Sequence, residues 1–306
     1  MSRKVIITLL TIFIIASLSV FYAMNKRQES ALVLMTDFGE KDGAVAAMKG
    51  VALNLAPTLN IHDLTHEIPA YNIWEGAFRL QQTAPYWAAG TVFVCVVDPG
   101  VGTERKSIIL KTKANHYFVG PDNGLFTLVA ESEGIDEIRE ISAANRLPNS
   151  QDSYTFFGRD VFAYSGAKLA SGIIEFKEVG NQIANNQLIM LSYPKPKFEN
   201  GTVSGGIPVL DIQYGNVWTN IDSKTLSNLQ VKIGDNLFIK IFEKDTLIYQ
   251  GIIPYHNTFG DVKEGENLSY MNSLLNLSLG INMGNFSESY KVFSGIDWKI
   301  EVRSEK

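Results

Sequence analysis

Three short segments place carboxylates and glycines directly after apolar, strand-like runs, an arrangement that could form a ligand site. They are Thr36-Asp37-Phe38-Gly39 with Asp42, Asp98-Pro99-Gly100-Val101-Gly102, and Gly120-Pro121-Asp122-Asn123-Gly124. In open α/β sheets, ligands bind beyond the carboxyl ends of the strands, where loops offer side chains and accessible backbone. The segments therefore predict one shared site, although aspartate and glycine are also common in ordinary turns.

Two of these segments suggest particular chemistry. A carboxylate can accept hydrogen bonds from both hydroxyls of a ribose, so Asp37 or Asp42 could hold a nucleoside. Asp98 and Arg105 are joined by a glycine-rich turn that could fold one side chain back onto the other. An arginine beside an aspartate stabilises the charged carboxylate, and the two could together hold a water molecule. A surface ion pair is the alternative.

Other chemistries have weaker support. His62 and His66 flank Asp63, but this run resembles a strand entering a loop, where the spacing does not bring two imidazoles together on a metal. We expect no metal and no cofactor. The chain has no Gly-x-Ser-x-Gly elbow for a nucleophilic serine, and its single cysteine, Cys95, lies in an apolar run and is predicted to be buried.

Residues 31–192 alternate strand-like and helix-like runs, which predicts an α/β domain with a mostly parallel sheet. The runs predict helices at 43–55, 73–83 and 162–171, strands at 31–35, 60–64 and 91–97, and a hairpin of 108–112 with 116–119. The proline-spaced residues 193–200 predict a linker. Residues 201–306 predict an all-β, barrel-like domain, with strands at 201–212, 216–221, 236–242, 246–253, 277–281 and 298–302.

Residues 1–30 are expected to be a targeting segment, either a signal peptide or a membrane anchor. Residues 5–24 carry no charge and follow Arg3 and Lys4. This length lies between a long signal-peptide core and a membrane-spanning helix, so cleavage and anchoring both stay open. Either one predicts export, with the body in the periplasm or elsewhere outside the cytoplasm, soluble after cleavage or anchored by residues 5–24.

The charge distribution argues against a nucleic-acid partner. Residues 1–30 contain four basic residues and one glutamate, a net charge of +3. The whole chain has a net charge of −5, so the remaining residues carry a net charge of −8. Phosphate binding depends on clustered lysine and arginine. The acidic body has no such cluster, and the Lys195-Pro196-Lys197 stretch is too short to form one.

In combination, the segments resemble the S-adenosyl-L-methionine hydrolases (adenosine-forming), which share a fold with the fluorinase and chlorinase enzymes. The similar segments run in order through nearly the whole body and are 34–51, 63–80, 90–105, 117–126, 155–163, 211–221, 258–266 and 272–285. The resemblance implies cleavage of the sulfonium of S-adenosylmethionine by attack at the ribose C5′, with water in the hydrolases and halide in the halogenases.

The resemblance also implies which residues perform this reaction. Asp98 and Arg105 match the side chains that support the water in hydrolases. The hydrolases have a histidine where this chain has Phe157, and the halogenases also have an aromatic residue there. Gly158 matches hydrolases and the chlorinase, whereas the fluorinase has a serine beside the halide.

Further residues are implied to bind the substrate. Asp42 matches the ribose-diol carboxylate, and Tyr71 an aromatic along the ribose. Leu274 stands where the fluorinase has an arginine for the methionine carboxylate. The expected binding residues are Asp37, Asp42, Tyr71, Phe156, Phe157, Gly158, Asp211, Asn216, Phe259, Ser273 and Met283. The family assembles as homotrimers, with the site between the N-terminal domain of one subunit and the C-terminal domain of its neighbour.

Three functions therefore stay open. The first is a hydrolase that releases adenosine and methionine, and the second is a halide-dependent S-adenosylmethionine lyase, suggested by Phe157. The third is a non-catalytic nucleoside-binding protein outside the cytoplasm, suggested by the missing histidine and by the leader.

Overall fold

A computed structural model describes residues 30–305, so the predicted leader lies outside the described residues. The chain divides into two compact units. The first contains the described residues up to Glu67, Trp87–Pro121 and Ile135–Gln187, and the second contains Ile68–Tyr86, Asp122–Gly134 and the residues from Leu188 onward. The second unit thus includes two segments from the first half of the sequence, and the linker at 193–200 stays a prediction.

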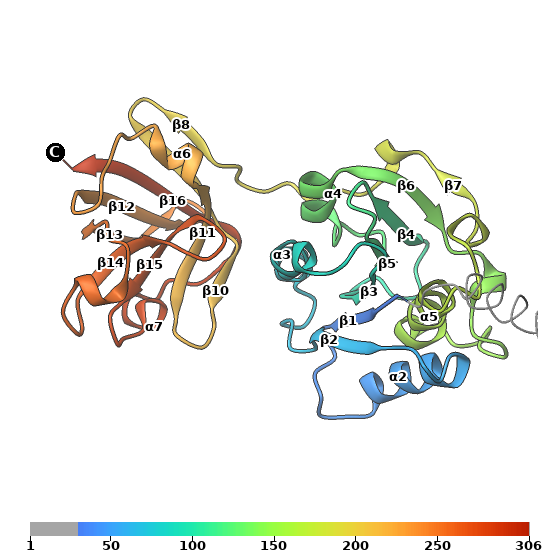
Figure 1. Cartoon of the computed structure of the whole chain (residues 1–306). Coiled ribbons are helices and arrows are strands. Elements are labelled where there is room, and N and C mark those ends of the chain that lie inside the picture. The colour runs from blue at the N-terminus through green and yellow to red at the C-terminus, as the bar shows by residue number, and fades with distance from the viewer. Residues whose placement is uncertain (1–29, 306) are drawn as a thin grey trace, which may run out of the picture. The chain divides into compact units, whose positions relative to one another are not determined.

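The first unit is built on a seven-stranded sheet with the order β2-β1-β3-β5-β4-β6-β7 (Figure 1). The neighbours β2, β1, β3 and β5 are parallel, and β4, β6 and β7 extend the sheet with antiparallel pairs. The strands are β1 (Leu32–Thr36), β2 (Ile61–Thr65), β3 (Val92–Val96), β4 (Ser107–Thr112), β5 (Tyr117–Pro121), β6 (Ile135–Glu140) and β7 (Gln182–Ile183). The predicted α/β class is confirmed, and the predicted hairpin is the β4–β5 pair.

Helices of the first unit bury an apolar face against the strands. In α2 (Ala44–Leu55), Val45, Met48 and Ala52 are buried at helical spacing. Met48 and Ala52 belong to the same hydrophobic core as Leu32 and Leu34 of β1. The remaining helices are the π-helix η3 (Gly158–Ala163), α5 (Tyr164–Ala170), η2 (Ala143–Asn145), η4 (Phe176–Glu178) and η5 (Asn185–Gln187). The helix expected at 162–171 thus begins earlier, with a π-turn, a feature that often marks functional sites.

The second unit contains two antiparallel sheets, with the orders β10-β11-β15-β14 and β13-β12-β16-β9-β8. This confirms the predicted β-rich C-terminal region. The strands are β8 (Lys197–Glu199), β9 (Thr202–Ile207), β10 (Val209–Asp211), β11 (Asn216–Asp222), β12 (Asn236–Glu243), β13 (Thr246–Pro254), β14 (Asn267–Met271), β15 (Asn276–Ile281) and β16 (Gly295–Glu305). The run expected as one strand at 201–212 is interrupted at Pro208, which has no backbone N–H for a ladder.

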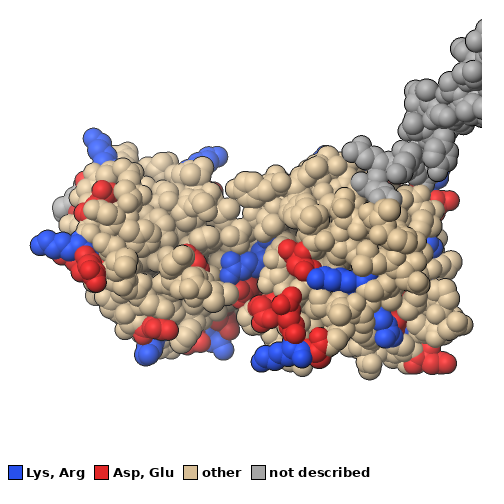
Figure 2. All heavy atoms as spheres, turned by 60° about the horizontal axis from the view of Figure 1, so that its bottom comes forward, with Lys and Arg blue, Asp and Glu red and all other residues tan. Residues whose placement is uncertain are grey.

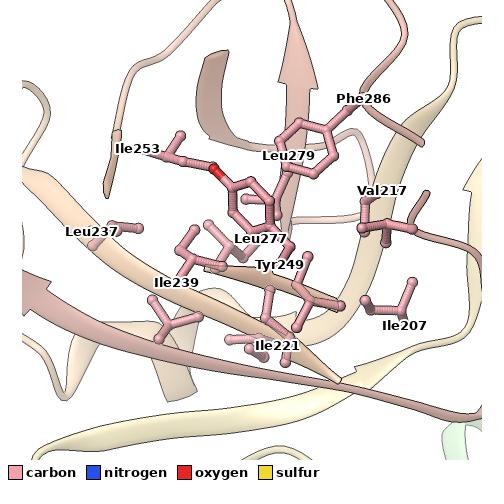
Figure 3. Packing of buried hydrophobic residues seen from close by; sticks show 14 of the residues in the cluster. Ile207, Val217, Ile221, Leu237, Ile239, Tyr249, Ile253, Leu277, Leu279 and Phe286 are labelled. Carbon is pink, nitrogen blue, oxygen red and sulfur yellow. The ribbon is translucent and has the colours of Figure 1, made fainter. Parts of the chain in front are cut away.

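Short helices complete the second unit: α3 (Ile73–Thr83), η1 (Ala84–Tyr86), α4 (Thr127–Glu133), α6 (Ser223–Ser227), η6 (Phe259–Asp261) and α7 (Phe286–Tyr290). The core between its sheets is formed by alternate apolar side chains (Figure 3). Leu237 and Ile239 of β12 meet Leu277 and Leu279 of β15 there, and Phe286 of α7 joins them. The alternating apolar positions of these strands therefore form the hydrophobic core of the second unit.

Because Tyr249 lies in the same core, we expect the free energy of unfolding to fall at alkaline pH. Burial raises the pKa of its phenol from 10.0 to about 12, with a smaller contribution from Tyr290. Above pH 10 the unfolded chain loses this proton while the folded chain keeps it, so stability falls between about pH 10 and 12, by roughly 2–3 kcal/mol for this group. Urea unfolding across this range should show a smaller loss for Tyr249→Phe than for wild type. The exposed Tyr86→Phe is the control, and an equal loss in all three proteins would contradict the assignment.

The surface of the described residues carries mixed charge. Figure 2 shows basic and acidic side chains interspersed on one face. Pairs such as Lys111 with Asp136, 2.7 Å apart, are typical. Within residues 30–305, no helix is both long and apolar enough to cross a bilayer.

Candidate functional site

Two of the predicted segments meet at one edge of the first unit's sheet. The parallel strands β1 and β3 are in register from Leu32 and Val92 to Thr36 and Val96, so the residues that follow them leave the sheet together. The backbone N–H of Asp37 donates to the carbonyl of Val96 over 3.3 Å. The structure therefore brings together the segments of Asp37 and Asp98, as predicted.

Asp98 and Arg105 form a buried, bidentate ion pair. Arg105 Nε donates to Asp98 Oδ1 over 2.8 Å, and Nη2 donates to Oδ2. The side chain of Arg105 is only 9% exposed and that of Asp98 only 4%, which excludes the surface ion pair. Arg105 Nη1 also donates to the Lys106 carbonyl and to Ser107 Oγ, so the guanidinium is held at three points. Each carboxylate oxygen has two lone pairs, so Asp98 retains capacity to accept from a water.

Phe157 lies against two guanidinium groups. The centre of its ring is 5.5 Å from the guanidinium carbon of Arg105 and 5.0 Å from that of Arg146. Arg146 is itself held by Ser150 and by the carbonyl of Ser153. These distances are typical of cation–π contacts, which favour an aromatic ring over a charged imidazolium at this position.

Gly158 packs closely against the Thr36–Gly39 turn. A Cβ at this position would lie 3.0 Å from the ring of Phe38. Phe38 also meets Phe156 edge-on, with ring centres 5.9 Å apart. A serine at 158 would therefore require Phe38 to move. Asp42 is exposed, and its Oδ1 accepts the backbone N–H of Ala44, the first residue of α2, over 2.9 Å.

A cavity of about 630 Å³ in the second unit gathers most of the C-terminal candidates. Asp211, Asn216, Phe259 and Met283 line it. Asn216 Nδ2 donates to Asp211 Oδ2 over 3.2 Å, across the β10–β11 hairpin. Asn216 Oδ1 is buried and has no hydrogen-bond partner among the described residues. Asn216 lines the cavity, but its unpaired oxygen is covered by protein and would have to move to accept a hydrogen bond from a ligand there.

Gly280 packs against two of the residues that line this cavity. A Cβ there would lie 2.6 Å from Asn216 Oδ1 and 2.8 Å from the ring of Phe259. Phe259 is tilted on Tyr270, with ring centres 4.9 Å apart. The missing side chain lets the ring lie directly on the strand. Met283 is 84% exposed and has a φ of +56°, a strained conformation of the kind that is common at ligand sites.

Three candidates lie outside this cavity. Ser273 is exposed and is not among the residues that line it. Tyr71 is 72% exposed and has a φ of +69°. Asp122, of the third predicted segment, accepts the backbone N–H of Ile189 over 3.0 Å, which gives it a structural role in the second unit. The sharing of one ligand site by the three segments stays a prediction.

Several residues of both groups carry no signal in the sequence. They are Phe38 and Arg146 in the first unit, and Tyr214, Tyr270 and Gly280 in the second. No spacing rule indicated Arg146, because a loop brings it to Phe157.

Cys95 is fully buried, as predicted, and burial raises the pKa of its thiol well above the usual value. Among residues 30–305 no group of three or more histidine, cysteine, aspartate or glutamate residues is placed to hold a metal ion.

Both halves of the chain match one protein family. Residues 32–180 match the SAM hydroxide adenosyltransferase N-terminal domain, and residues 205–299 match the C-terminal domain of the same family. The chain belongs to the SAM hydroxide adenosyltransferase family. This family contains S-adenosylmethionine hydrolases and fluorinases, so the predicted family is confirmed.

Curated relatives of both kinds are similar to the chain. The (R)-S-adenosyl-L-methionine hydrolase of Methanocaldococcus jannaschii is 38% identical over 219 residues, which cover 70% of this chain and 74% of the relative. A fluorinase of Actinopolyspora mzabensis is 26% identical, covering 88% and 96%. The crystal structure of an uncharacterized conserved protein from Thermotoga maritima superimposes with a TM-score of 0.82 at 34% identity, covering 89% and 99%.

Proposed function

We propose that this protein hydrolyses S-adenosyl-L-methionine to adenosine and L-methionine, with water attacking the ribose C5′. The observation that carries the proposal is the buried Asp98–Arg105 pair at the strand ends. A charged carboxylate fixed in this way can orient a water and accept its proton. The hydrolases among the relatives support the same reaction.

The chemistry needs little beyond position and a proton acceptor. Oxygen of the water forms a bond to C5′, the C5′–S bond breaks, and its electron pair stays on sulfur. The sulfonium leaves as neutral methionine, so no acid is needed, and the proton from the water passes by way of Asp98 to solvent. The main requirement is a water held in line at about 3–3.5 Å from C5′.

The cavity of the second unit suits the base of the substrate. Phe259 offers a ring face for stacking, and the unpaired Asn216 Oδ1, once turned toward the cavity, can accept from an exocyclic amino group. We assign the adenine to this cavity and the attacking water to the Asp98–Arg105 pair. We assign Asp42, Asp37 and Tyr71 to the ribose, Asp211 and Ser273 to the methionine, and the backbone of Met283 to the adenine edge. Phe156, Phe157 and Gly158 would border the reacting carbon.

The direct test is incubation of the purified full-length protein with S-adenosylmethionine, followed by chromatography. Equal amounts of adenosine and methionine are expected, and heavy oxygen from labelled water should appear in the adenosine 5′-hydroxyl. Bound but unchanged S-adenosylmethionine would instead favour the non-catalytic binding protein, and neither binding nor product would reject both proposals.

A halide-dependent lyase is the second candidate, because Phe157 gives the site an aromatic residue flanked by two guanidinium groups. The close packing of Phe38 against Gly158 means that a serine beside a halide would require Phe38 to shift, which weighs against this function. Chloride, bromide and fluoride distinguish the two reactions. A 5′-halogenated nucleoside formed only with halide would support the lyase, whereas adenosine at the same rate without halide would exclude it.

Phe157→His should raise turnover if the protein is a hydrolase. The imidazole would add a hydrogen-bonding group for the water, and the two neighbouring guanidinium groups would disfavour its charged form. We expect an increase in kcat of roughly ten- to hundredfold, measured as adenosine release. Phe157→Leu, which has no donor or acceptor, is the control. Unchanged binding without turnover in both variants would indicate a binding protein.

We also propose that the protein is exported and assembles as a homotrimer. The uncharged residues 5–24 support the export, either as a cleaved signal peptide or as an anchor. Cell fractionation, with the mass of the mature protein, tests the location and the cleavage. Analytical ultracentrifugation of the purified protein tests the trimer, and a concentration-independent monomer mass would contradict it.

A further inference from the structure

Behind the Thr36–Gly39 turn, four side chains form a continuous hydrogen-bonded relay that the proposed reaction does not use. Lys49 on α2 donates to Asp63 on β2 over 2.6 Å, and the other oxygen of Asp63 lies 3.0 Å from His66 Nε2. His66 Nδ1 lies 2.8 Å from the hydroxyl oxygen of Thr36. The relay runs from a half-exposed ammonium to a hydroxyl that is 0% exposed.

The carboxylate fixes one proton of the imidazole. Asp63 can only accept, so His66 carries a proton on Nε2. In the neutral imidazole, His66 Nδ1 then accepts the hydroxyl proton of Thr36. The Thr36 oxygen in turn accepts the backbone N–H of Phe38 over 3.2 Å. In this tautomer no polar atom of the buried imidazole is left unpaired.

The acidic end of the relay is stable as a charged group. Burial alone would raise the pKa of Asp63, but hydrogen bonds from Lys49 and His66 outweigh it and hold this pKa below its usual value. Asp63 also pairs with Lys49 over 2.6 Å, through the oxygen that does not contact the imidazole. Loss of His66 would therefore not leave an unpaired carboxylate in the protein.

The relay ends on the turn that borders the Asp98 segment. The carbonyl of His66 accepts the N–H of Gly39 over 2.8 Å, so His66 binds the turn through its backbone and, by way of Thr36, through its ring. Between these two attachments lie Asp37 and Phe38. Phe38 is the residue whose ring packs against Gly158.

We propose that His66 is a positioning residue, whose imidazole holds the Thr36 hydroxyl and with it the conformation of the Thr36–Gly39 turn. The structural part of this inference is independent of the reaction. Its catalytic consequence, that the turn presents Asp37 to the ribose, rests on the proposed function.

A double-mutant cycle tests the relay. Thr36→Val removes the hydroxyl and His66→Leu removes the imidazole, and each substitution leaves an apolar side chain of similar size. In the full-length protein, we expect each to speed amide hydrogen exchange at Phe38 about tenfold, and the double variant to be no faster than either single one. Thr36→Ser, which keeps the hydroxyl, should restore slow exchange. Additive effects, or unchanged exchange at Phe38, would overturn the proposal.

The buried His116 provides a matched control. It lies in the same unit, is 4% exposed, and is bonded to the carbonyl of Trp87. His116→Leu should lower stability without faster exchange at Phe38, and equal acceleration there would show that His66 acts only through global stability. For S-adenosylmethionine, the His66 and Thr36 variants should raise KM roughly fivefold or more while kcat changes little. If the wild-type protein shows no turnover, the proposed function fails. Amide hydrogen exchange at Phe38 still decides whether the relay holds the Thr36–Gly39 turn.

Discussion

Asp98→Asn is expected to lower the kcat of adenosine formation by about 10²- to 10⁴-fold, the range usual for loss of a group that accepts a proton. The amide keeps the size of the carboxylate but cannot take a proton from the attacking water. Binding should change little, because Asp98 is assigned to the water and not to the substrate. Single-turnover kinetics with S-adenosylmethionine, together with its Kd from calorimetry, separate the two effects.

Folding must be checked in the same variant, since Arg105 is only 9% exposed and loses its charged partner. A destabilisation of about 1–3 kcal/mol is expected from this unpaired group, measured by thermal unfolding. Asp136→Asn is the matched control, because Asp136 pairs with Lys111 at the surface and is 49% exposed. A variant Asp98→Asn that turns over at the wild-type rate would remove Asp98 from the mechanism.

Phe259→Ala is expected to raise the Kd for adenosine about ten- to hundredfold, because stacking of a base on an aromatic side chain contributes about 1–3 kcal/mol. Phe259 lies in the cavity that also contains the unpaired Asn216 oxygen. Isothermal titration with adenosine measures this effect without depending on turnover.

Two further variants sharpen this result. Phe293→Ala removes a 54% exposed phenylalanine of the same unit that does not line the cavity, and it should bind adenosine normally. Gly280→Ala adds a methyl group that would lie 2.8 Å from the ring of Phe259, so it should weaken binding although no contact is removed. Wild-type affinity in Phe259→Ala would place the base elsewhere.

The sequence predicted those parts of the site that depend on strand ends. The apolar runs before Asp37 and Asp98 identify buried strands, and parallel neighbours bring their carboxyl ends to one edge. The turn between Asp98 and Arg105 is short, so their pairing could also be expected. Burial of the pair could not, because it depends on aromatic side chains such as Phe157 and Phe162 that come from a distant segment.

Long-range packing explains what the sequence did not reveal. Arg146 reaches Phe157 from a loop, and the helix expected at 162–171 gives no sign that a π-turn begins at Gly158. His66 was considered only as a metal ligand, whereas its partner Thr36 is thirty residues away. Residues 68–86 and 122–134 join the second unit through tertiary packing, which a division by composition does not capture.

The unpaired oxygen of Asn216 has a consequence for the choice among purines. A buried carbonyl oxygen can accept a hydrogen bond from the amino group at C6 of adenine. Hypoxanthine has an oxygen at C6 instead, and the lone pairs of the two oxygens would repel each other. Deamination of the base would therefore turn the best contact of the cavity into a repulsive one. If the base binds in this cavity as proposed, the protein would distinguish adenosine from inosine before any bond is broken, by a single oxygen that has no hydrogen-bond partner among the described residues.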